Sequence, residues 1–241
     1  MRAWAIELRK EKRTGIMPIM LAIGVLGAAY ELANFAVRGD ALMALPLAPM
    51  DVLLTQLYGV VMVINMFGIT VAACVMYAME FSGSAIKKMY MLPMSAAGMY
   101  ACKFMILVLM FTAALVMQYL MLGHIGLTYL PEGAFDARAL VAFAAYSLAT
   151  SLPVLSLMLL ISSRFESMWI PLGVGVAGFL SGMALANVDA YGVMLHPFVT
   201  MLHPAVVMSA QPDGIVIAIS LAETAVLFMA GLWLAGRGLK E

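Results

Sequence analysis

The chain has 241 residues, of which 65% are hydrophobic and only 11% are charged, and its formal net charge is zero. Soluble domains average about 25% charged residues, so this composition excludes a soluble protein with a charged surface. The mean hydropathy of +1.03 points the same way. We expect an integral membrane protein with membrane lipid as its surroundings and no nucleic-acid partner.

Residues 1–14 show an apolar side and a strongly polar side at helical spacing. This pattern predicts a short amphipathic helix that lies along the lipid headgroups. Its expected interface anchors are Trp4, Arg9 and Lys10. The apolar run that follows is longer than the core of a signal peptide, so we interpret it as a retained first membrane span.

Six apolar runs are long enough to cross a hydrocarbon core, which requires about 20 residues. They lie at about residues 16–37, 52–79, 96–122, 139–161, 168–188 and 214–235. The fourth run contains Pro153, which removes one helical hydrogen bond. The predicted fold is therefore an all-α integral membrane protein with six transmembrane helices in one domain, residues 1–241.

The basic residues are distributed unevenly between the two ends of these spans. With alternating sides, all thirteen lysines and arginines fall on one side except Arg38 and Arg138. The positive-inside rule then places both termini in the cytoplasm. Lys103 lies inside the third span, and we expect its long side chain to snorkel back to the cytoplasmic interface.

Segment 189–213 is largely apolar, but three prolines interrupt it, and the stretches between them are too short to span a membrane. We expect a broken helical segment, re-entrant or lying on the surface, on the outer side. Within it, Met-Leu-His-Pro occurs twice, and a seven-residue offset could place His196 and His203 on one side. No nearby carboxylate or cysteine completes a ligand set, so no metal site is expected. Cys74 and Cys102 fall inside spans and are interpreted as packing residues.

Polar side chains within the spans are candidates for a substrate path or for hydrogen bonds between helices. They are Gln56, Asn65, Gln118 and Glu223. For each residue taken separately, hydrogen bonding between helices is the commoner role. Such a hydrogen bond contributes about 0.6 kcal/mol. Glu31 and Asn34 are expected near the outer end of the first span, where water is close. The 24 methionines suit either helix packing or walls that receive varied apolar ligands.

Segment 80–95 is a polar interruption on the side predicted to be cytoplasmic. Glu80 ends a span, Gly83 supplies a turn, Ser84 can cap a helix and Pro93 stops it. Between them lies a short amphipathic helix with two lysines. From these properties alone the helix could rest on lipid as a connector, or dock into a partner and transmit its movements.

The acidic span end, the glycine turn, the basic amphipathic helix and the Leu-Pro-x-Ser stop resemble the cytoplasmic loop of type-2 ABC exporter permeases. The resemblance extends to the span layout and implies that this segment couples the membrane helices to an ATPase. The implied coupling residues are Glu80, Gly83, Ser84, Lys87, Lys88, Met89, Leu92 and Pro93. Members of this family often carry threonine at the position of Ser84. Serine retains the hydroxyl group that can cap the helix.

Residues 7–14 are similar to the start of permeases of lantibiotic immunity transporters. The resemblance implies export of a lantibiotic or similar amphiphilic peptide by a pair of permeases, identical or related, with two ATPase subunits. The chain has no phosphate-binding loop motif, so ATP and Mg are expected on a separate ATPase chain. This chain is expected to be a non-catalytic transport subunit of the bacterial cytoplasmic membrane.

Two other functions remain open from the sequence. The same machinery could export another lipid, drug or polysaccharide, or the chain could be a membrane sensor or assembly factor that needs no ATPase. A membrane-embedded enzyme would require clustered nucleophiles, bases or metal ligands. The spans contain no Ser/His pair, His/Glu/His spacing or paired aspartates.

Overall fold

Five helices are long and apolar enough to cross a membrane, by length and composition, among the residues that the structure describes. The computed structural model describes residues 15–81, 95–186, 188 and 191–237. Regular secondary structure within these ranges is entirely helical. This confirms the prediction of an all-α membrane protein.

The elements follow one another along the chain with short connections. They are α2 (Ile16–Met43), α3 (Pro49–Asp51), the π-helix η1 (Val52–Leu57), α4 (Gly59–Phe81), α6 (Ala96–Tyr129), α7 (Ala137–Ser162), α8 (Trp169–Leu185), the 3-10 helix η3 (Tyr191–Leu195), α9 (Pro197–Val206) and α10 (Gly214–Arg237). At 17 residues, α8 is shorter than the roughly 20 residues that a straight crossing requires.

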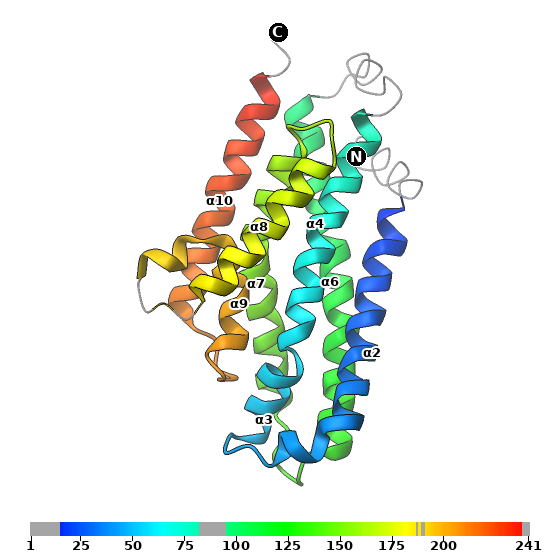
Figure 1. Ribbon diagram of the computed structural model, residues 1–241, viewed down its shortest axis with the longest axis vertical. Coiled ribbons are helices and arrows are strands. Elements are labelled where there is room, and N and C mark those ends of the chain that lie inside the picture. The colour runs from blue at the N-terminus through cyan, green and yellow to red at the C-terminus, as the bar shows by residue number, and fades with distance from the viewer. Residues whose placement is uncertain (1–14, 82–94, 187, 189–190, 238–241) are drawn as a thin grey trace.

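The long helices run side by side, with α7 near the middle of the bundle (Figure 1). Helix α2 packs on α6 and α4, while α10 packs on α7 and α6. Helix α9 packs on α7, α8 and α4. The end of α4 and the start of α6 lie at one end of the bundle, which we call the hairpin end, and the end of α2 lies at the other (Figure 1).

Helix α2 is longer than expected, because it continues through Arg38 and Asp40 to Met43. The polar residues lie beyond the predicted span end at residue 37, but no proline before Pro46 interrupts the helical backbone. Leu42 is buried and so stabilises the additional turn. The connection therefore covers only residues 44–48, and Glu31 lies about 18 Å from Met43 along the axis at 1.5 Å per residue.

Helix α6 is also longer than expected and ends at Tyr129 rather than near residue 122. His124, which follows the predicted span end, is an exposed residue of this helix. The second span begins at Pro49 and contains the π-helix η1, where the Thr55 hydroxyl donates to the Asp51 carbonyl at 2.6 Å. The wider π-helical turn shifts the register of the residues that follow it.

The segment before the last span is helical and broken, as expected from its prolines. It contains η3 and α9, which begins at Pro197 directly after His196. Proline suits this first position because its missing N–H would have no partner there. The interfacial helix expected at 1–14 and most of segment 80–95 lie outside the described residues.

Candidate functional site

The residues assigned to the coupling element are only partly within the described ranges. Glu80 is described, in the last turn of α4. The remaining assigned residues lie outside the described ranges: Gly83, Ser84, Lys87, Lys88, Met89, Leu92 and Pro93, together with the expected interface anchors Trp4, Arg9 and Lys10. On the far side of the segment, the Ser95 side chain accepts from the Gly98 N–H at 3.1 Å and caps α6.

A buried ion pair joins the two helices that flank this segment. The Lys103 ammonium lies 2.9 Å from a carboxylate oxygen of Glu80, and the two side chains are 1% and 6% exposed. The ammonium also lies 5.4 Å from the ring centroid of Tyr77. The expectation that Lys103 reaches the interface is therefore wrong. Its charge is compensated inside the protein, between α4 and α6.

Asn65 and Gln118 form a reciprocal amide pair in the core between α4 and α6. The Asn65 amide donates to Gln118 Oε1 at 2.9 Å, and the Gln118 amide donates to Asn65 Oδ1 at 2.8 Å. Gln118 also donates to the Ile23 carbonyl of α2 at 3.3 Å. A Cβ on Gly27 would collide with the Gln118 amide, so the glycine makes room for the pair.

Two tyrosines and a serine extend this pair toward α7. Asn65 donates to the Tyr58 hydroxyl at 3.1 Å, and the Tyr58 and Tyr119 rings lie 5.0 Å apart. The Tyr119 and Ser147 hydroxyls are 2.5 Å apart. We call the set Tyr58, Asn65, Gln118, Tyr119 and Ser147 the polar core network. It links α2, the second span, α6 and α7 through groups that are all buried.

Glu31 lies next to this network and was missed as a candidate. Its side chain is 0% exposed, and electrostatic interactions connect it to Tyr58 and Tyr119. Neither carboxylate oxygen has a hydrogen-bond partner among the described residues. The expectation that Glu31 is close to water at the outer end of the span is wrong, because neighbouring elements cover its side chain completely.

Two of the four polar span candidates do not join the network. Gln56 is half-buried in η1 and makes no side-chain hydrogen bond to any described residue. Glu223 is half-buried in α10, and its Oε2 atom has no hydrogen-bond partner within the described ranges. The structure thus brings Asn65 and Gln118 together and leaves Gln56 and Glu223 apart from them.

The two histidines of the proline-rich segment contact different helices. His196 Nε2 lies 3.2 Å from the Ser181 hydroxyl of α8, whereas His203 Nδ1 lies 3.2 Å from the Tyr146 hydroxyl of α7. Burial lowers the pKa of both histidines, and nearby Asp213 partly opposes this effect on the His203 pKa. The part of the chain that the structure describes contains no group of three potential metal ligands.

In a comparison with family models, the ABC-2 family transporter protein model matches residues 4–182. The match covers well over half of the chain. The chain belongs to the ABC-2 transporter family. It is the membrane permease component of an ABC transporter, a multi-pass transport subunit and not itself a catalyst. No match was found among curated proteins or among solved structures.

Membership of the ABC-2 family confirms the resemblance to ABC-2 permeases and implies partnership with ABC ATPase subunits. The matched region includes segment 80–95 and the Glu80–Lys103 pair, and it ends within α8. Helices α9 and α10 lie beyond it. The narrower resemblance to lantibiotic immunity permeases stays a prediction.

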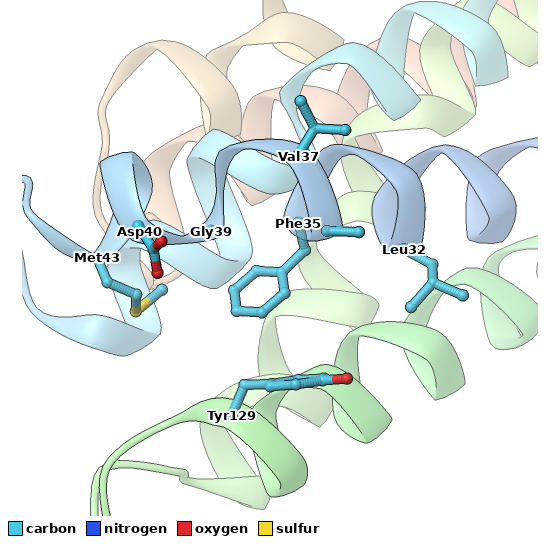
Figure 2. A pocket seen from close by; sticks show the side chains of 8 residues that line it. Leu32, Phe35, Val37, Gly39, Asp40, Met43 and Tyr129 are labelled. Atoms are coloured by element: carbon cyan, nitrogen blue, oxygen red, sulfur yellow. The ribbon is translucent and has the colours of Figure 1, made fainter.

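Two surface hollows of this permease lie along α2 and α6. At the end opposite the hairpin end, a cleft of about 330 Å³ is bordered by Phe35, Asp40, Met43 and Tyr129 (Figure 2). The rings of Phe35 and Tyr129 face one another across the two helices at 5.0 Å. Nearer the start of α2, an apolar groove of about 430 Å³ is lined by residues that include Met17, Met20, Met110 and Met117. Flexible methionine side chains adapt to apolar ligands of varied shape.

Proposed function

We propose that this ABC-2 permease exports an amphiphilic peptide, and that two ATPase subunits drive it through segment 80–95 on the cytoplasmic side. A second permease, identical or related, completes the transporter. ATP and Mg act on the ATPase chains. The amphiphilic cargo is proposed because of the lantibiotic-type N-terminal resemblance, and the methionine-lined groove is compatible with it.

The observation that carries the coupling proposal is the Glu80–Lys103 ion pair. It joins the last turn of α4 to the second turn of α6, so it fixes the two helix ends from which segment 80–95 emerges. A push on that segment would reach both helices together, because a buried charge pair resists separation. Through α6 the movement would reach the polar core network and α2.

The coupling proposal predicts that charge reversal at the hairpin end removes the ATPase. The two lysines are proposed to face an acidic surface of the ATPase, so K87E/K88E would place like charges against one another, which costs several kcal/mol. The double variant is expected to reduce copurification of the coexpressed ATPase at least about tenfold. The matched control is R38E/R138E, which reverses two exposed basic residues away from that segment. Loss of the ATPase in R38E/R138E and its retention in K87E/K88E would show that the permease has the opposite orientation in the membrane. Retention in both variants would contradict docking of the ATPase through Lys87 and Lys88. Failure of the wild-type permease to copurify with the ATPase would favour a sensor or assembly role.

The cargo proposal predicts protection of cells against membrane-active peptides. Cells with the permease and its ATPase are expected to tolerate several-fold higher doses of cationic amphiphilic peptides than cells with a hydrolysis-deficient ATPase. The measurement is the inhibitory concentration for a panel of lantibiotics, neutral amphiphilic drugs and detergents. Protection against the drugs alone, with unchanged killing by every peptide, would contradict a peptide cargo and indicate another amphiphile.

A further inference from the structure

Glu31 is an acidic residue deep within a membrane-spanning helix. It lies about 22 Å from the start of α2 and about 18 Å from its end along the axis. A hydrocarbon core is about 30 Å thick. Arg38, the first charged residue that follows it, is seven residues or about 10 Å further along the axis. The enclosure of the Glu31 side chain by the protein, at 0% exposure, therefore separates the carboxyl group from water.

The polar groups around Glu31 already have partners. Asn65 and Gln118 pair with each other, and the Tyr119 hydroxyl contacts Ser147. The titratable groups facing Glu31 are Tyr58, at the end of η1, and Tyr119 of α6. The α4 contribution to this region is Asn65, which does not titrate. No ion pair joins Glu31 to a described lysine, arginine or histidine.

An ionised carboxylate in such a place is strongly disfavoured. Without water, a cation or a hydrogen-bond donor, a buried charge costs several kcal/mol, whereas a neutral carboxylic acid costs much less. A proton requires no cavity, and the residues packed around Glu31 leave the side chain with no exposed surface. The surroundings therefore suit the protonated acid.

We infer that Glu31 is a proton-binding site whose occupancy is coupled to the conformation of the bundle. In the packed conformation the carboxylate holds one proton as a neutral acid. When α2 separates from η1 and α6 and water enters, the O–H bond breaks, the electron pair stays on the carboxylate and the proton passes to water. Repacking takes up one proton again. A transport cycle that opens and closes this contact thus releases and binds one proton.

Infrared spectroscopy of the full complex in lipid tests the resting protonation state. The wild-type spectrum is expected to contain the carbonyl stretch of a protonated carboxylic acid at neutral pH, and the difference spectrum against E31Q should isolate it. E132Q, which changes an exposed loop carboxylate, is the matched control and should leave that intensity unchanged. An E31Q spectrum with undiminished protonated-carboxyl intensity would overturn the inference.

The pH profile of ATP hydrolysis by the same complex tests the coupling. Glutamine resembles the protonated acid, so E31Q should hold the bundle packed at every pH. The ratio of wild-type to E31Q hydrolysis should rise with pH, by at most about tenfold per unit for one proton. E132Q should follow the wild-type profile. A wild-type to E31Q ratio that stays constant across the pH range would exclude proton release at this position, even if the infrared band is present.

Discussion

Replacing Lys103 with methionine is expected to lower the free energy of unfolding of the permease by about 3–5 kcal/mol, the usual cost of breaking a buried ion pair. The Glu80 carboxylate would lose the ammonium that lies 2.9 Å away. Glu80 also stands in the last turn of α4, where the helix dipole disfavours negative charge. The measurement is the thermal unfolding of the purified permease, with the folded yield in membranes as a second readout.

The double variant E80L/K103M separates the charge effect from a packing effect. Replacing both members of a buried pair by apolar residues is often neutral or stabilising, so the double variant should recover most of the lost stability. If the pair also transmits movement, the recovered protein should still show weakened stimulation of ATP hydrolysis by cargo. Wild-type stability of K103M would contradict the buried pair and return Lys103 to the interface.

The spans were predictable because a bilayer imposes two strong conditions on the sequence. A crossing segment must be apolar over about 20 residues, and its backbone must satisfy its own hydrogen bonds. Those conditions place the centres of α2, α4, α6, α7 and α10 well. They say little about the ends, where Arg38 and Asp40 resemble a loop in composition but continue α2.

The polar contacts could be anticipated only in part. Asn65 and Gln118 stand out as polar residues in apolar runs, yet their pairing depends on the depth at which α4 and α6 meet. Glu80 and Lys103 carry a usable signal, because a carboxylate at a span end and a cation inside the next span lie on neighbouring arms of one hairpin. Local composition could not distinguish that pairing from snorkelling.

The sequence pattern gave the wrong position for Glu31, because it ended the first span at residue 37 whereas α2 continues to Met43. Packing of α6, α4 and η1 against α2 encloses its side chain, and the π-helix η1 sets the register that brings Tyr58 near it. A π-helix arises from tertiary packing and has no clear signature in the sequence. The residue for which we infer proton binding therefore emerged only from the three-dimensional arrangement.

The second large effect is expected at the amide pair of the polar core network. Q118L should lower the free energy of unfolding by about 1–3 kcal/mol, because it leaves the buried Asn65 amide without its partner. N65L should cost at least as much, since it leaves Gln118 Oε1 without its donor and also removes the donor to the Tyr58 hydroxyl. Individual interhelical hydrogen bonds in membranes average only about 0.6 kcal/mol, so the orphaned group rather than the lost bond dominates the effect.

The double variant N65L/Q118L decides between these two contributions. Removing both amides leaves neither amide without its partner, so its thermal unfolding should recover most of the loss although both reciprocal hydrogen bonds are gone. The remaining loss is expected from the Tyr58 hydroxyl and the Ile23 carbonyl, which lose their amide donors. G27A provides an independent check, because its added Cβ would displace the Gln118 amide while both partners remain in the chain. It should therefore destabilise the protein in the same direction as Q118L. Additive losses in N65L/Q118L would mean that the two side chains act separately and that the pair does not hold α4 against α6.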